Sequence, residues 1–248
     1  KFKTWYKQNG TPKVTLKRIW DIKNKRLIIK ASQSSLKSNN PYNELPLIIP
    51  INIGIISSRE EIITRTLILE EKTQEFIIKN TQNDSKVPII TYFRNFSAPV
   101  DWESDTTFKE KLLIIEKETD FFTIFQTIKG IYKTIIINRL NDKPDFNIEN
   151  KLIKTISSII KNKKEINLSL LSEILSIPTF SELESELNNI DPLKIYKTID
   201  ELNSLFGTKL KNELINKIID IEKHLNKTWP EGRDERKLIG TIWKLLLH

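Results

Sequence analysis

Two hydrophobic periods meet in residues 88–117, which read PIITYFRNFSAPVDWESDTTFKEKLLIIEK. Up to residue 100 the apolar residues come in short β-branched runs broken by turn residues, which is typical of strands. From Thr106 onward they recur every three or four positions, which is typical of amphipathic helices. The sequence therefore predicts a change from β to α structure close to Val100.

The N-terminal part predicts a small β-sandwich over residues 1–100. Its expected strands are residues 13–19, 26–33, 45–56, 64–69, 75–79 and 88–96. Short strands of partly alternating or apolar pattern, separated by polar connections, favour two packed antiparallel sheets.

The C-terminal part predicts an α-helical superhelix of αα-hairpins over residues 101–248. Its expected helices are residues 106–117, 121–138, 148–161, 169–176, 180–188, 192–205, 209–225 and 234–247. Asp191 before Pro192 is an expected N-cap, Thr179 precedes another helix start, and Gly207 is expected as the left-handed residue that ends a helix. Short links between many helices favour stacked antiparallel pairs.

The last expected helix carries little polar surface, because Ile239, Ile242, Trp243 and residues 245–247 are all apolar. A terminal repeat should present a polar outer face. We therefore expect an incomplete superhelix that continues past His248, the alternative being a final helix docked back on the core. The start at Lys1, without Met, likewise predicts a cut-out piece or a processed chain.

The net charge of +8 and the pI near 9.4 first suggest a nucleic-acid partner. Residues 1–30, however, hold ten Lys or Arg against the single Asp21, a net charge of +9, so the other 218 residues sum to −1. The basic character is confined to one strip, and we do not expect nucleic-acid binding.

Chemical motifs are sparse in this chain. Cys is 0 and His is 2 (His224 and His248), so no metal site of the usual His or Cys type is expected, and His224 is expected at the end of a helix. The six glycines form no phosphate-binding loop. The acidic groups Glu60-Glu61, Glu70-Glu71 and Glu182/Glu184/Glu186 are interpreted as solvated surface. We expect no catalytic, cofactor-binding or metal-binding residue.

Trp5 and Tyr6 are the candidate contact residues. They lie among lysines in a segment before the first expected strand. Such aromatics either stack on nucleotide bases or pack against a neighbouring domain. The second interpretation is favoured, so both are predicted interdomain contacts.

Several stretches carry a family resemblance. They are Trp-Tyr-Lys-Gln-Asn-Gly-Thr-Pro at residues 5–12, Val14-Thr15-Leu16, Gln33, residues 45–51, Phe-Arg-Asn-Phe-Ser-Ala-Pro-Val at residues 93–100, and Asp191-Pro192. With these the chain resembles the C-terminal portion of the aminopeptidase N family of zinc-dependent metalloaminopeptidases. The resemblance implies an immunoglobulin-like β-sandwich followed by the first part of a helical superhelix.

The resemblance places the zinc ligands and the catalytic residues in an upstream catalytic domain, outside this chain. It implies a chain that is inactive alone, braces that domain and walls the chamber of an enzyme that removes N-terminal residues from peptides. The resemblance also implies that zinc is a cofactor of the full-length enzyme only, and that the partners are the upstream domain and, through it, peptide substrates. The alternative is a self-standing binding module for a protein or nucleic acid.

The sequence also gives an expectation about the cellular compartment and about a membrane span. The absence of cysteine fits the cytoplasm. The apolar run at residues 45–56, with two prolines inside it, is too short for the ~20 residues of a membrane span.

Overall fold

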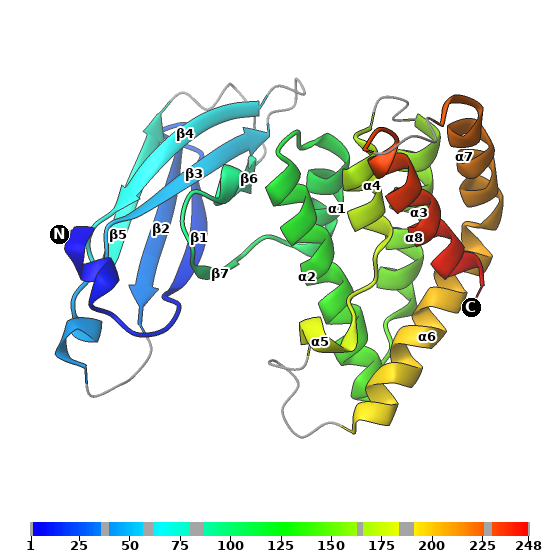
Figure 1. The fold of residues 1–248 in the computed structure, drawn as a ribbon. Coiled ribbons are helices and arrows are strands. Elements are labelled where there is room, and N and C mark those ends of the chain that lie inside the picture. The colour runs from blue at the N-terminus through cyan, green and yellow to red at the C-terminus, as the bar shows by residue number, and fades with distance from the viewer. Residues whose placement is uncertain are drawn as a thin grey trace. The chain divides into compact units, whose positions relative to one another are not determined.

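The computed structural model describes residues 2–35, 40–56, 62–79, 87–162, 166–183, 191–225 and 230–247. The chain divides into two compact units, Lys1–Ile124 and Phe125–His248, whose elements are labelled in Figure 1. The strands are β1 (Lys13–Asp21), β2 (Arg26–Ser34), β3 (Ile49–Ile56), β4 (Ile62–Leu69), β5 (Thr73–Lys79), β6 (Ile89–Thr91) and β7 (Asp101–Ser104). The α-helices are α1 (Phe108–Lys117), α2 (Phe121–Leu140), α3 (Phe146–Asn162), α4 (Leu168–Leu175), α5 (Phe180–Leu183), α6 (Pro192–Lys209), α7 (Lys211–His224) and α8 (Arg233–Leu246).

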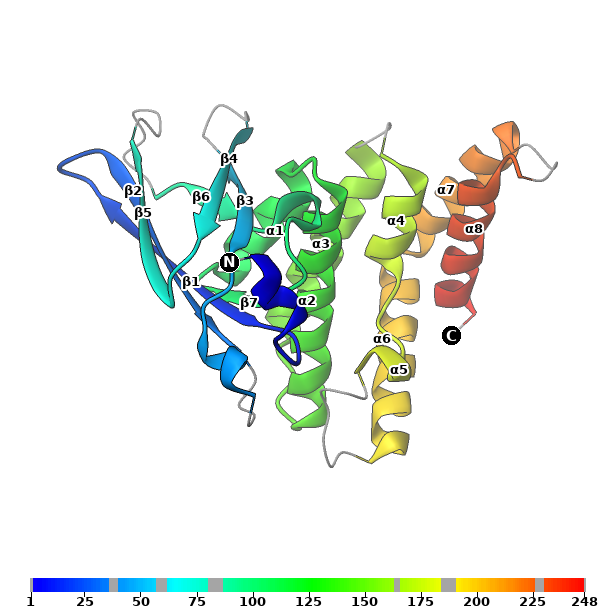
Figure 2. The same cartoon turned by 60° about the vertical axis from the view of Figure 1, so that its left-hand side comes forward.

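The first unit contains a two-layer β-sandwich, as the sequence predicted, together with α1 and the start of α2. One sheet has the strand order β5-β2-β1-β7 and the other the order β4-β3-β6. Figure 2 shows β2 and β5 in one layer and β3 and β4 in the other. Alternate residues of the strands face inward, so that Val14, Leu16, Leu27, Ile29 and Ile51 are fully buried between the layers.

The structure departs from the expected strands around residue 100. The strand expected over residues 88–96 ends at Thr91, because Phe93, Asn95 and Phe96 take left-handed backbone conformations with φ of 56°, 55° and 51°. Residues 101–104, expected to open the helical part, instead form β7, which pairs in parallel with β1. The alternation of exposed and half-buried residues in β7 directs Trp102 onto the core.

The second unit is an array of packed helices, which confirms the predicted helical architecture. Tyr132 of α2 lies 5.6 Å from the ring of Phe206 of α6, and its hydroxyl donates to the carbonyl oxygen of Ile174 in α4 at 2.8 Å. The expected cap at Asp191 is present, since its carboxylate accepts from the backbone N–H of Leu193. Residues 184–188 of the expected helix 180–188 lie outside the described residues.

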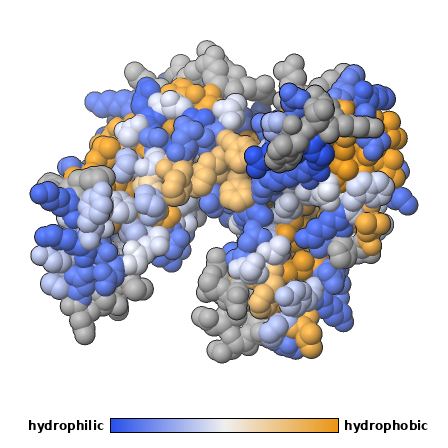
Figure 3. Space-filling view, in the orientation of Figure 1, coloured by the Kyte–Doolittle hydropathy of each residue, from blue (hydrophilic) through white to orange (hydrophobic). Residues whose placement is uncertain are grey.

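Helix α8 buries Leu238, Ile242 and Leu245 and packs against α4 and α6. Its other side leaves Trp243 46% exposed. Figure 3 shows apolar side chains gathered over α7 and α8. Continuation of the array past residue 248 stays a prediction. Among the described residues, no helix is both long enough and apolar enough to span a bilayer.

Gly207 does not end a helix, contrary to the expectation. It is buried inside α6, where a Cβ would lie 1.9 Å from the carbonyl oxygen of Leu245 in α8. The glycine is needed for the close approach of two helix backbones rather than for a left-handed conformation.

We predict that Gly207→Ala destabilises the protein by about 3 kcal/mol, because the added methyl group forces α6 and α8 apart. The matched control is Gly130→Ala in α2, where a Cβ meets nothing within 4 Å. This control should gain about 1 kcal/mol, since alanine is the better helix former. Urea unfolding of the three proteins measures both effects, and equal midpoints would contradict the assignment.

Candidate functional site

The chain enters the β-sandwich through an N-terminal clasp formed by Trp5, Gln8 and Gly10. The indole N–H of Trp5 donates to the carbonyl oxygen of Ile48 at 2.9 Å, and the Trp5 ring packs against the core. The side-chain amide of Gln8 donates to the carbonyl oxygens of Tyr42 at 2.8 Å and Leu45 at 2.6 Å. Gly10 turns the chain toward β1 with φ of 78°. The clasp ties residues 5–10 to the sandwich itself.

The two predicted contact residues have different surroundings. Trp5 is half-buried against its own unit, whereas Tyr6 is 85% exposed. The ammonium group of Lys7 lies 4.5 Å from the centre of the Tyr42 ring. Tyr6 therefore has surface free for a partner, and its interdomain role stays a prediction.

Several cations of the basic strip, residues 1–30, form ion pairs with carboxylates of the same unit. Lys13 pairs with Glu103 at 3.5 Å and Lys30 with Glu75 at 3.6 Å, both exposed. Arg26 pairs with Asp21 at 2.8 Å. Such local pairing removes part of the positive field that nucleic acid would need.

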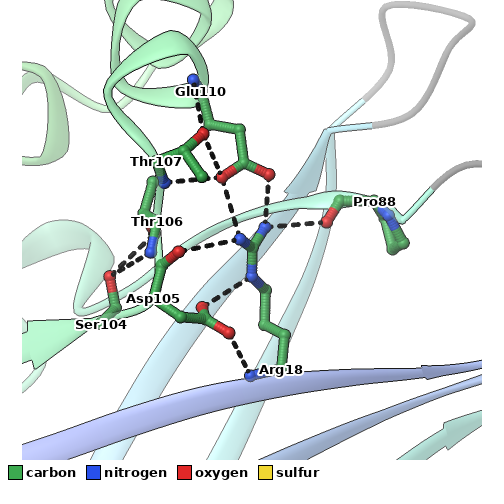
Figure 4. A network of polar contacts seen from close by, with 7 residues as sticks. All are labelled: Arg18, Pro88, Ser104, Asp105, Thr106, Thr107 and Glu110. Atoms are coloured by element: carbon green, nitrogen blue, oxygen red, sulfur yellow. Dashed lines mark hydrogen bonds and ion pairs between the residues drawn. The ribbon is translucent and has the colours of Figure 1, made fainter.

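Among the described cations of the strip, Arg18 is the most enclosed, with a side chain only 6% exposed. Its guanidinium donates at 2.8 Å to Asp105 and at 2.9 Å, in bidentate fashion, to Glu110 of α1, as Figure 4 shows. It also donates to the carbonyl oxygen of Pro88 at 3.2 Å. Arg18 therefore joins β1 to the segment that leads into α1.

Glu110 also closes the N-terminus of α1. Its carboxylate accepts from the backbone N–H of Thr107 at 2.8 Å, while the Thr107 hydroxyl accepts from the backbone N–H of Glu110, which forms a capping box. Burial alone would raise the pKa of Glu110, but the hydrogen bonds from Arg18 and Thr107 hold that pKa below its usual value.

Glu118 is a buried carboxylate, with a side chain 0% exposed, that holds the left-handed turn at residues 93–96. One oxygen accepts from the Thr91 hydroxyl at 2.8 Å, and the other from the Arg94 guanidinium at 2.9 Å. The oxygen that accepts from Arg94 also accepts from the backbone N–H of Thr119 at 2.7 Å and of Asp120 at 3.0 Å. A buried carboxylate is tolerated only when its charge is paired and both of its oxygens accept hydrogen bonds, as they do here.

Asp120 connects the same left-handed turn to the start of α2. Its carboxylate accepts from the backbone N–H of Asn95 at 3.2 Å and from the backbone N–H of Thr123 at 2.9 Å. The ring of Phe96 meets that of Phe122 edge to face at 5.1 Å. The motif at residues 93–100 thus joins the sandwich to the first turn of α2.

In the second unit, Arg139 of α2 likewise forms ion pairs with carboxylates of other helices. It donates to both carboxylate oxygens of Glu149 in α3, at 2.8 and 2.9 Å, and Glu149 is 2% exposed. A third bond reaches Glu201 of α6 at 3.3 Å. The pKa of Arg139 is raised chiefly by its hydrogen bond with Glu149. These bonds fix α2, α3 and α6 to one another.

The described residues do not fit a metal centre. No group of three or more His, Cys, Asp or Glu is close enough among them to hold an ion. His224 is exposed at the last position of α7, where it was expected, and His248 lies outside the described residues. Glu70 and Glu71 are exposed, whereas Glu60, Glu61, Glu184 and Glu186 also lie outside the described residues.

An open hollow lies where the starts of α4 and α8 meet. Asn167, Leu168, Gly232, Arg233, Asp234 and Glu235 are among its lining residues. Its acidic and basic groups are mixed, and Asn167 already caps α4 by accepting from the backbone N–H of Leu170 at 3.0 Å. The hollow therefore has no clear ligand preference.

Two consecutive stretches of the chain match families of known fold. Residues 10–105 match a domain of unknown function, DUF3458, with an Ig-like fold. Residues 109–248 match the domain of unknown function DUF3458_C, which consists of ARM repeats. The chain belongs to the family that carries this ARM-repeat domain behind the Ig-like one.

The resemblance to aminopeptidase N is confirmed by similar proteins. The chain is 22% identical over 226 residues to "Aminopeptidase N" of Escherichia coli (strain K12), which covers 86% of the chain and 26% of that protein. It is 23% identical over 208 residues to "Aminopeptidase N" of Caulobacter vibrioides, which covers 83% of the chain and 24% of that protein.

A solved structure shares the fold. The crystal structure of Legionella pneumophila aminopeptidase A in complex with aspartic acid superposes with a TM-score of 0.82 at 18% identity, over 98% of this chain and 28% of that one. The chain is homologous to the C-terminal domains of aminopeptidase N and spans about a quarter of the length of these relatives.

Sequence reasoning did not find the roles of Arg18, Glu118 and Arg139. Arg18 and Glu110 are 92 residues apart in the sequence, and Arg94 and Glu118 are 24 apart. No periodic signal links such pairs. The single local signal is the Thr107 and Glu110 spacing of the capping box.

We predict that Glu118→Gln destabilises the protein by about 3 kcal/mol, because it leaves Arg94 without its buried counter-charge. The control Glu44→Gln removes the exposed pair with Lys72 and should cost less than about 0.5 kcal/mol. Urea unfolding monitored by tryptophan fluorescence compares the two variants. Equal losses would contradict the role given to Glu118.

A second prediction concerns pH. Since the pKa of Glu110 is lower in the folded than in the unfolded protein, its stabilisation is present above the usual value of 4.5 and is lost as pH falls through the folded value. Glu110→Gln should cost about 2 kcal/mol at neutral pH, and this gap should close on acidification below pH 4.5. Urea unfolding at several pH values measures the gap, and a gap independent of pH would refute the argument.

Proposed function

We propose that this chain is the non-catalytic C-terminal portion of a zinc metalloaminopeptidase that removes N-terminal residues from peptides. The observation that carries the proposal is the match of the chain, an Ig-like domain followed by ARM repeats, to about a quarter of aminopeptidase N. The matched proteins bear the name of an aminopeptidase, and the matched part lies at their C-terminal end.

The zinc of such an enzyme would lie outside this chain. Zinc sites take nitrogen, sulfur or carboxylate ligands in groups of three or four. The described residues bring no such group together, and the whole sequence holds 0 Cys and 2 His. We therefore propose that the ligands come from the preceding part of the longer protein and that this chain contributes no step of the chemistry.

The proposed contribution of this chain is shape. Buried ion pairs and hydrogen bonds join the sandwich to α1 and the start of α2, which makes the first unit a stiff brace for a catalytic domain. Stacked helical repeats form extended concave surfaces. We propose that the second unit uses such a surface to wall the substrate chamber, and that Tyr6 contacts the catalytic domain.

We further place the enzyme in the cytoplasm. A chain of 248 residues without a cysteine is well suited to a reducing compartment, where disulfides would contribute nothing.

The proposal predicts that the purified 248-residue chain releases no product from aminoacyl reporter substrates and binds no stoichiometric zinc. The longer natural protein that contains this chain should release product and bind stoichiometric zinc, because the proposal puts the zinc ligands in the preceding part. Colorimetric assay and metal analysis on the two proteins test this. Activity of the short chain that survives metal chelation, or a longer protein that is inactive with zinc, would overturn the proposal.

A further inference from the structure

A row of isoleucines crosses the outer face of the four-stranded sheet. Ile19 of β1 is paired in register with Ile28 of β2, and Ile28 with Ile77 of β5. Ile19 is 50% and Ile77 is 53% exposed. Ile22, in the turn between β1 and β2, is 69% exposed. We call Ile19, Ile28 and Ile77 the isoleucine row.

The isoleucine row is not needed to fill the core. The neighbours Leu27 and Ile29 point to the opposite face of β2, where both are fully buried. The outer face of an antiparallel sheet is ordinarily polar when it faces water. Single exposed apolar residues are common, but contiguous ones across three strands indicate a contact surface.

Charged residues flank the row on both sides. Lys17, Lys30 and Glu75 are paired in register across the three strands on one side. Asp21, Arg26 and Lys79 are paired in register on the other side.

These charges leave an excess of cations. The carboxylate of Glu75 is paired with Lys30 and that of Asp21 with Arg26. Within the described part of the chain, Lys17, Lys79 and the turn residue Lys23 have no carboxylate within ion-pair distance. We call these three lysines the lysine rim. The surface is thus apolar at its centre and positive at its edge.

We propose that the isoleucine row and the lysine rim dock an acidic, apolar surface of the preceding part of the same natural protein. The proposal rests on the proposed function, which gives this chain such a preceding part. The relatives have about three quarters of their length outside the matched region, so ample chain exists to supply the surface.

Charge and side-chain type favour an acidic, apolar protein surface over a second copy of this chain and over nucleic acid. A second copy would bring the lysine rim against itself, and like charges oppose association. Single-stranded nucleic acid stacks its bases on aromatic side chains, whereas this row is aliphatic. A partner surface that has carboxylates around apolar side chains would complement both the lysine rim and the isoleucine row.

Cysteine labelling tests the proposal, because these 248 residues contain 0 Cys and one introduced thiol is a unique probe within them. In the longer protein, labelling is measured on the proteolytic peptide that carries residue 77. Ile77→Cys is made in the 248-residue chain and in the longer natural protein, and the rate of maleimide labelling is compared. Labelling should be at least about tenfold slower in the longer protein, a protection equivalent to about 1.4 kcal/mol. The control Thr64→Cys, exposed on a strand of the other sheet, should change by less than about twofold.

Charge reversal tests the lysine rim. Lys17→Glu combined with Lys79→Glu should restore labelling of the introduced thiol in the longer protein to within about threefold of the rate in the short chain, because repulsion replaces attraction. High salt should act in the same direction. Circular dichroism and the unfolding midpoint of the short chain serve to show that these exposed substitutions leave the fold intact.

Three outcomes would overturn the inference. They are equal labelling in the two proteins, protection that charge reversal does not relieve, and protection in the short chain that grows with its own concentration, which would indicate a second copy. The aminopeptidase assay remains separate. An active longer protein with an unprotected thiol rejects the docking surface alone, whereas an inactive one rejects the proposed function.

Discussion

A buried carboxylate, Glu118, is the constraint on which the junction between strands and helices depends. Taking a charge out of water costs several kcal/mol, so both carboxylate oxygens must find hydrogen-bond donors. The donors at Glu118 come from β6, from the left-handed turn and from the entry to α2. Since these segments meet at one side chain, none can shift without exposing the charge. The turn is thereby held in backbone conformations that non-glycine residues seldom adopt.

The architecture was largely predictable because it follows from local periodicity. Alternation in the first hundred residues and a helical period afterwards are properties of neighbouring residues, and so is the cap at Asp191. What failed depends on distant partners. Gly207 was interpreted by its usual role at helix ends, but its neighbour is Leu245, which no sequence window contains. The strand β7 escaped notice because its alternation spans only four residues.

The polar groups of the β-domain serve two different purposes. Arg18, Arg94 and their carboxylates are enclosed and hold segments of the same unit together. Lys17, Lys23 and Lys79 remain at the surface beside aliphatic side chains. In the sequence, Arg18, Lys17 and Lys23 all belong to one basic strip over residues 1–30. Only the pairing in the folded chain separates cations that stabilise the fold from cations available to a partner.

The close approach at Gly207 has a consequence for the geometry of the helical array. The curvature of a repeat array is the sum of small rotations between successive helices. Where α6 crosses α8, no side chain separates the two backbones, so the main chain of one helix meets that of the other directly. Main-chain atoms have none of the rotameric freedom of a leucine or methionine spacer. The crossing therefore acts as a rigid pivot, and the angle between α6 and α8 is set by a missing methyl group.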